Sequence, residues 1–268
     1  MGAGEKTLEG FFKLDSTHYL YFRGYVVWNQ QLLFDNEFLP VVTEHFKSDR
    51  IDHYIKDYNG AFNLVIVSNN SIKIYNDRWG TFPIYYHYRD DIVAVSNDWK
   101  KLLPHLTNKK ISTESAIEIH TFGYVMGKKT LVKGIYECQP HAISKFLFSD
   151  GTYSFHEKDY WVFHYPFTKI KHTSRLEQEF AELWRQQIRI YTDFLKTHNY
   201  NAYIHISGGL DSRLLLYSFD KAGIRSRTMT YGASLLSNEI KTALQVLPHV
   251  RNTLETRILF YNKSYLSE

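Results

Sequence analysis

A hexapeptide at residues 207–212, Ser-Gly-Gly-Leu-Asp-Ser, constrains the fold more than any other part of this sequence. A strand-like segment at residues 203–206 precedes it, and an apolar helical pattern that ends near Gly223 follows it. Paired glycines let the backbone bend sharply, and free amides at the start of a helix bind phosphate. In a parallel sheet such a loop lies at the carboxyl end of its strand, where ligands bind. The order strand, loop and helix therefore predicts a phosphate-binding loop.

The loop differs in spacing from two common nucleotide loops, because it is neither Gly-x-x-x-x-Gly-Lys-Ser/Thr nor Gly-x-Gly-x-x-Gly. It resembles the pyrophosphate loop of the ATP pyrophosphatases, which cleave ATP between the α and β phosphates, and its wording is closest to the asparagine synthetases. The plainer alternative is a Gly-Gly turn between a strand and a helix. A carboxylate beside phosphate oxygens suits Mg²⁺, which makes Asp211 the expected metal ligand. The residues expected to bind ATP and pyrophosphate are Ser207, Gly208, Gly209, Leu210, Asp211, Ser212, Tyr231 and Gly232.

The length of 268 residues is enough for two domains, and 44% hydrophobic residues support globular cores. The net charge of +4 is mild and its lysines and arginines are scattered, so we expect no nucleic-acid partner. One cysteine excludes an intramolecular disulfide and fits a reducing compartment. No apolar run approaches membrane-spanning length and no signal peptide is recognisable, so a cytoplasmic location is expected.

Short apolar runs separated by turn residues predict that antiparallel strands dominate the first half of the chain. Residues 61–67 and 72–75, joined by a turn at Asn69-Asn70, have the composition of a β-hairpin. Two further strands are expected at residues 83–88 and 92–95. Helical spacing appears at residues 38–46 and 51–58, each after a helix-start signal.

Several segments of this half resemble, in the right order, the glutamine amidotransferase domain that precedes the synthetase domain in asparagine synthetases. That resemblance implies an N-terminal-nucleophile fold, an αββα sandwich of two antiparallel sheets between helices. The segments that carry it are 59–62 (Asn-Gly-Ala-Phe), 77–86 (Asp-Arg-Trp-Gly-Thr-Phe-Pro-Ile-Tyr-Tyr), 122–125, 130–135, 139–141 and the pair Tyr160-Trp161.

The chemistry of that family needs a cysteine at the mature N-terminus, with its own α-amine as the base. Here the chain opens Met-Gly-Ala-Gly, and Cys138 is the only cysteine. We expect Cys138 to be a packed residue that behaves as a small hydrophobe. Removal of a leader before Thr7 would expose a threonine nucleophile, but no flanking residue argues for such processing. Asn29-Gln30-Gln31 is at best a degenerate form of the family's glutamine-binding Asn-Gly-Glu turn, so glutamine hydrolysis is not expected.

In the second half of the chain, strand-like segments alternate with helical ones, which predicts an α/β domain with a parallel sheet. A capping box at Ser174-x-x-Glu177 is expected to begin a long helix, and strands are expected at residues 203–206, 224–232 and 257–261. Residues 230–232, Thr-Tyr-Gly, with Glu239 downstream, resemble the family segment whose backbone contacts adenine. The predicted organisation is an amidotransferase-like domain at 1–158, a linker at 159–172 and a partial ATP-pyrophosphatase domain at 173–268.

A doubly wound nucleotide domain usually has five or six strands, whereas the third expected strand here lies close to Glu268. The expectation is a C-terminally incomplete synthetase domain, with an exposed apolar sheet edge or a partner chain that supplies the rest. The family resemblance implies an AMP-forming carbon–nitrogen ligase that uses ATP and Mg²⁺ to adenylate a small-molecule carboxylate for amidation, as in asparagine biosynthesis. The alternatives are an inactive ATP-binding scaffold, a partner-docking module, or a relative of the β-lactam synthetases or lasso-peptide cyclases. No catalytic residue is assigned.

Overall fold

The computed structural model describes residues 9–89, 91–165 and 173–261. The chain forms two compact units, Met1–Phe167 and Thr168–Glu268. No helix in the described part of the chain combines the length and the apolar character that crossing a membrane requires.

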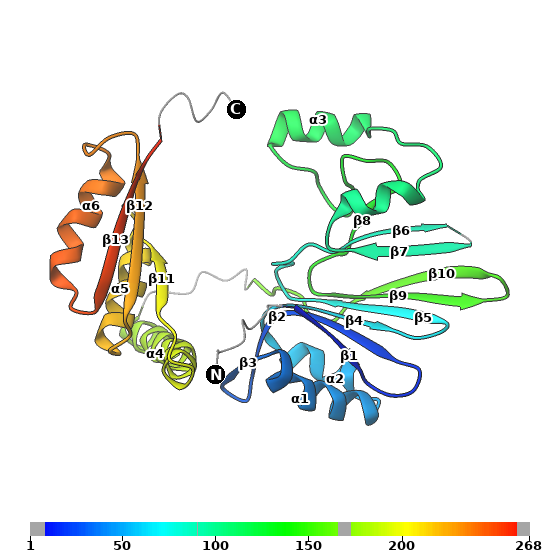
Figure 1. The fold of residues 1–268 in the computed structure, drawn as a ribbon, viewed down its shortest axis with the longest axis horizontal. Helices are drawn as coiled ribbons and strands as arrows, with labels where there is room; N and C mark the ends of the chain where they lie inside the picture. The colour runs from blue at the N-terminus through cyan, green and yellow to red at the C-terminus, as the bar shows by residue number, and fades with distance from the viewer. Residues whose placement is uncertain (1–8, 90, 166–172, 262–268) are drawn as a thin grey trace, which may run out of the picture. The chain divides into compact units, whose positions relative to one another are not determined.

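The first unit is built on a large antiparallel sheet with the strand order β1-β2-β4-β5-β9-β10, and β3 also pairs with β2 (Figure 1). The predicted hairpin at residues 61–75 is confirmed, because β4 and β5 pair antiparallel across the turn. The strands are β1 (Glu9–Lys13), β2 (Tyr19–Trp28), β3 (Gln31–Phe34), β4 (Asn59–Val67), β5 (Ser71–Asn76), β9 (Ala142–Ser149) and β10 (Thr152–Asp159).

A second, smaller sheet has the order β7-β6-β8, with β6 (Tyr85–Arg89), β7 (Ile92–Ser96) and β8 (Tyr136–Glu137). One face of the large sheet packs against the helices α1 (Asp35–Lys47) and α2 (Ile51–Tyr54) and the 3₁₀ turn η1 (Ile55–Asp57), through a core that includes Phe38, Tyr58 and Phe62. The other face packs against the small sheet through Ile84, Tyr86 and Phe146.

The 3₁₀ helix η2 (Trp99–His105) packs against β6 and β7. The helix α3 (Thr113–Phe122) lies on the side of the small sheet that faces away from the large sheet (Figure 1). The layers therefore run helix, sheet, sheet, helix, which is the αββα sandwich expected for this unit.

The second unit is a three-stranded parallel sheet with the order β11-β12-β13. Its strands are β11 (Ala202–His205), β12 (Ser226–Gly232) and β13 (Thr253–Phe260), and its helices are α4 (Ser174–Thr197), α5 (Leu210–Lys221) and α6 (Asn238–Val246), with a 3₁₀ turn η3 (Leu247–His249) after α6. Its core joins one face of the sheet to all three helices, through residues such as Ile204, Phe219 and Ala243. The predicted parallel α/β arrangement is confirmed.

Three local predictions need correction. The cap of α4 is Thr173, whose hydroxyl accepts a hydrogen bond from the amide of Leu176 at 3.3 Å, so Ser174 is already inside the helix. The helix expected at residues 51–58 is one α-helical turn followed by the 3₁₀ turn η1. The strand expected from Arg257 begins earlier, at Thr253.

Candidate functional site

The predicted phosphate loop lies between β11 and α5, at the carboxyl end of the first parallel strand (Figure 1). Two serines of the loop are hydrogen-bonded to each other. The hydroxyls of Ser207 and Ser212 are 3.1 Å apart, and the amide of Ser207 donates to Oγ of Ser212 at 3.1 Å. The amide of Gly209 donates to Oγ of Ser207 at 3.2 Å. These short-range bonds join the loop to the first turn of α5 and fix its shape.

The start of α5 is open. Gly209 is its N-terminal cap, so no side chain caps the helix, and Leu210 and Asp211 occupy its first turn. The first-turn amides of a helix have no partner within the helix, and they carry its positive dipole end. Asp211 and Ser212 lie inside the helix, because α5 begins at Leu210 and Gly209 is its cap.

A second helix begins at the same place. A Cβ built on Gly208 would lie 3.9 Å from both the backbone nitrogen of Glu239 and Oγ1 of Thr242. Glu239 is in the first turn of α6, whose cap residue Ser237 also makes no side-chain capping bond. Two helix N-termini with free amides therefore converge on a residue that has no side chain. This arrangement fits a phosphate group.

Asp211 is exposed, and in the part of the chain that the structure describes it forms no hydrogen bond or ion pair with a side chain. Within the same residues, no group of three or more His, Cys, Asp or Glu side chains is placed to hold a metal ion. A single free carboxylate fits Mg²⁺ bound together with phosphate oxygens, because Mg²⁺ commonly takes one or two carboxylates and completes its shell with phosphate and water.

Tyr231 and Gly232 lie at the carboxyl end of β12, next to the loop in the sheet, since the amide of Ile206 donates to the carbonyl of Met229. The Tyr231 ring stacks on His205 with centroids 4.8 Å apart. Gly232 is tightly enclosed, because an added Cβ would lie 2.6 Å from Cβ of Ser237. The structure thus brings the two predicted parts of the nucleotide site to one edge of the sheet.

In the first unit, the turn after β5 is organised by Asp77, whose side chain is fully buried. Its carboxylate accepts hydrogen bonds from the amides of Phe62 at 3.1 Å, Trp79 at 2.8 Å and Thr81 at 3.1 Å. The neighbouring Arg78 donates to Oδ1 of Asn59 at 2.6 Å. The Thr81 hydroxyl also donates to Oδ1 of Asp77 at 3.2 Å, so this carboxylate is occupied by hydrogen bonds that hold the turn and is not placed to act on a ligand.

The same unit matches a known family. The model of the glutamine amidotransferase domain matches residues 41–161. Over these residues the first unit is glutamine amidotransferase-like. The αββα layering agrees with the fold expected for such a domain, and the match includes the Asp77 turn, the small sheet and the pair Tyr160-Trp161.

Two solved structures were also found. The chain is 12% identical to glutamine phosphoribosylpyrophosphate amidotransferase from B. subtilis, complexed with ADP and GMP, with a TM-score of 0.32 over 57% of this chain and 31% of that one. It is 11% identical to the allosteric regulatory enzyme of purine biosynthesis, with a TM-score of 0.35 over 95% of this chain and 63% of that one. The chain thus spans less than two thirds of the length of either, and scores this low establish no shared fold. The search of curated proteins found no match.

Cys138 of the first unit is buried against the small sheet, as predicted, with 1% of its surface exposed. Burial raises the pKa of its thiol far above the usual range, so it carries no thiolate. Asn29 and Gln30 form the tight turn between β2 and β3, both with positive φ. Thr7 and the opening Met-Gly-Ala-Gly lie outside the described residues.

Proposed function

We propose that this chain is an ATP-dependent, AMP-forming carbon–nitrogen ligase of the asparagine synthetase type. The observation that carries the proposal is the convergence of two uncapped helix N-termini, those of α5 and α6, on Gly208. The loop sequence alone fits a simple turn. A simple turn gains nothing from the N-terminus of a second helix beside its glycine. The diphosphate of a nucleotide, by contrast, is stabilised by the N-termini of both helices.

In this proposal the amides of Gly208, Leu210 and Asp211 hold the β and γ phosphates of ATP, and the hydroxyls of Ser207 and Ser212 complete the loop. Asp211 would hold Mg²⁺, which would offset the negative charge of the phosphates. The backbone of Tyr231 and Gly232 contacts adenine. Neither Gly208 nor Gly209 has the positive φ that would require glycine for conformational reasons. In this proposal they are glycines because a side chain would keep the phosphates away from the backbone amides.

The reaction follows from that placement. A carboxylate oxygen of the substrate attacks the α phosphorus, the bond from that phosphorus to the bridging oxygen breaks, and pyrophosphate leaves. The loop amides stabilise the negative charge that develops on this leaving group. An amine or ammonia then displaces AMP from the acyl-adenylate, and the amide forms. No described residue is assigned to activate the amine.

Glutamine hydrolysis is not part of the proposal, because the only cysteine of the sequence is buried in the first unit. Ammonia, or an amine within the substrate, is therefore the expected nitrogen donor. Aspartate is the first carboxylate to test, since the loop wording resembles that of the asparagine synthetases.

The experiment combines the full chain with ATP, Mg²⁺, aspartate and ammonia and measures pyrophosphate. Release that depends on aspartate and is abolished by Asp211→Asn supports the ligase. ATP binding without pyrophosphate release from a panel of carboxylates identifies an inactive ATP-binding scaffold. Release with a substrate that carries its own amine identifies a relative of the β-lactam synthetases or lasso-peptide cyclases. If the chain binds no ATP, the ligase proposal is wrong, and the partner-docking module is the alternative that remains.

We also propose that β13 is completed by a partner chain. In the described residues β13 pairs only with β12, and Leu254, Leu259 and Phe260 on it are each about half exposed. An exposed apolar edge strand accepts another strand readily. Light scattering of the purified chain tests self-association through this edge. A mass that stays monomeric with and without Leu259→Lys would exclude a second copy as that partner.

A further inference from the structure

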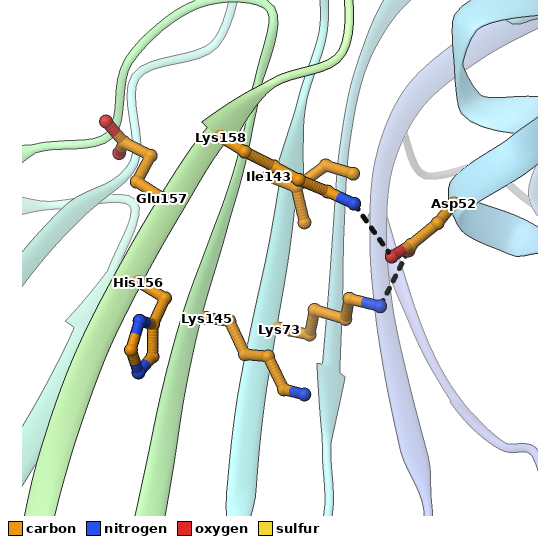
Figure 2. A pocket seen from close by; sticks show the side chains of 7 residues that line it. All are labelled: Asp52, Lys73, Ile143, Lys145, His156, Glu157 and Lys158. Carbon is orange, nitrogen blue, oxygen red and sulfur yellow. Dashed lines mark hydrogen bonds and ion pairs between the residues drawn. The ribbon is translucent and has the colours of Figure 1, made fainter.

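A basic cavity lies on the large sheet of the first unit, beside α2, which contributes Asp52 to its lining. Its volume is about 250 Å³. Lys73 on β5, Lys145 on β9 and His156 on β10 stand side by side across its base, and Lys158 and Asp52 border it (Figure 2). These residues come from one helix and three different strands, so their spacing in the sequence gives no sign of the cluster.

The register of the sheet places the basic groups directly against one another. Lys73 pairs with Lys145, and Lys145 pairs in turn with His156. Like charges directly opposite in neighbouring strands destabilise a sheet. A row of this kind on an exposed strand pair is costly unless an anion lies over it.

The cavity contains too little negative charge to neutralise the row. The carboxylate of Asp52 accepts from Nζ of Lys73 at 2.6 Å and from the hydroxyl of Tyr75 at 2.7 Å, and Nζ of Lys158 is 3.7 Å away. Burial acts to raise the pKa of Asp52, but these neighbours outweigh it and hold that pKa below its usual range, so the carboxylate is ionised. One carboxylate thus faces three ammonium groups.

The second acid beside the cavity is already bound. The carboxylate of Glu157 accepts from Oγ of Ser144 at 2.7 Å and pairs with Lys128. Figure 2 shows this carboxylate pointing away from the lysine row. Lys145 has no ion-pair or hydrogen-bond partner for its ammonium group within the described residues. The cavity therefore presents a partly enclosed, unneutralised ammonium group at the centre of the row.

We propose that this cavity binds the phosphate group of a small molecule, with Lys145 and Lys158 as its main ligands. The volume suits a phosphate or diphosphate and is below the range of about 300–1,000 Å³ typical of larger ligands. A compact dianion neutralises the row that Asp52 leaves unbalanced, and ammonium groups bind phosphate as point charges. The proposal is independent of the ligase function, because the cavity and the predicted ATP loop lie in different units of the chain.

The test titrates the full chain with inorganic phosphate in a calorimeter and by thermal melting, at constant ionic strength set with chloride. Wild type should bind phosphate saturably and melt at a higher temperature as phosphate rises. Lys145→Gln should weaken binding about tenfold or more, the expected loss of one charge-assisted contact. Lys109→Gln, which removes the same charge from an exposed loop, and Asp211→Asn, which alters the ATP loop, should leave phosphate binding through Lys145 unchanged.

The melting temperature without phosphate separates a ligand site from a structural role. Lys145→Gln should melt at or above the wild-type temperature, because it removes the central charge of a repulsive row. A lower melting temperature, unchanged phosphate affinity in Lys145→Gln, or the absence of saturable binding in wild type would each overturn the proposal.

Discussion

Gly208 and Glu239 meet where two helices begin: a Cβ on Gly208 would lie 3.9 Å from the backbone nitrogen of Glu239. The contact distance is ordinary, so the site has room for a methyl group in the absence of ligand. The same space is where the amides of both helices would hold phosphate. Gly208 is therefore a residue at which folding and ligand binding can be separated.

Gly208→Ala should fold with wild-type stability and lose ATP affinity at least tenfold, because its methyl group occupies the position of a phosphate oxygen. Calorimetric titration with Mg·ATP measures the loss, and thermal melting measures the stability. Unchanged ATP affinity in a folded variant would place the nucleotide elsewhere.

Gly232→Ala provides the contrasting case. Its Cβ would lie 2.6 Å from Cβ of Ser237 and 3.0 Å from Cδ1 of Ile240, so the start of α6 must shift. Overpacking of this kind costs about 1–3 kcal/mol. Denaturant unfolding of the second unit should show that loss, and an unchanged midpoint would mean that the turn before α6 adjusts freely.

Ser212→Ala removes the acceptor for the amide of Ser207 and the partner of its hydroxyl. The loop should lose its fixed shape, and affinity for ATP should fall by about tenfold, the value of one well-placed hydrogen bond. Ser218→Ala, on the same helix but bonded to Trp184, is the matched control. It should cost about 1 kcal/mol of stability and leave ATP affinity unaltered; equal effects of the two variants on affinity would contradict a specific role for Ser212.

Asp77→Ala should destabilise the first unit by about 3 kcal/mol or more, because it leaves the amides of Phe62, Trp79 and Thr81 without their acceptor. Asp77→Asn keeps one acceptor oxygen and should lose less. Urea unfolding gives both values. A variant as stable as wild type would show that these amides find other partners.

His45 should make the stability of the first unit depend on pH. It is buried, its Nδ1 lies 2.5 Å from the Tyr58 hydroxyl, and burial lowers its pKa from the ordinary value. The unfolded state then binds a proton that the folded state resists, so stability falls as the pH drops below about 6.5 and continues to fall until the folded pKa is passed. Unfolding from pH 8 to pH 5 should show a shallower decline in His45→Gln than in the exposed-site control His53→Gln.

Much of the fold was predictable because the signals were local. The strand composition of residues 61–67 and 72–75 and the turn at Asn69-Asn70 predicted the hairpin of β4 and β5. The parallel strands of the second unit follow from helices between strand-like runs. The helix α3 was missed although its signals are present: Oγ of Ser112 accepts from the amide of Ser115, and Gly123 ends the helix with φ of 83°. The start of β13 was missed because Thr253-Leu254-Glu255 lacks the apolar run of a buried strand.

The candidate sites also differ in how far the sequence predicts them. The loop at Ser207–Ser212 could be predicted because its residues are contiguous. The approach of α6 to Gly208, and the row Lys73, Lys145 and His156, depend on how distant elements pair. Strand register decides such juxtapositions, and a shift of one residue would turn each side chain to the other face.

Hydrogen exchange at the loop amides tests the central claim most directly. The first-turn amides of α5 and α6 have no partner within their helices and should exchange rapidly in the free protein. Addition of Mg·ATP should slow exchange in peptides that cover residues 207–212 and 238–240, and should leave exchange in the first unit unchanged. Exchange at these peptides that stays equally fast in saturating Mg·ATP would contradict the account.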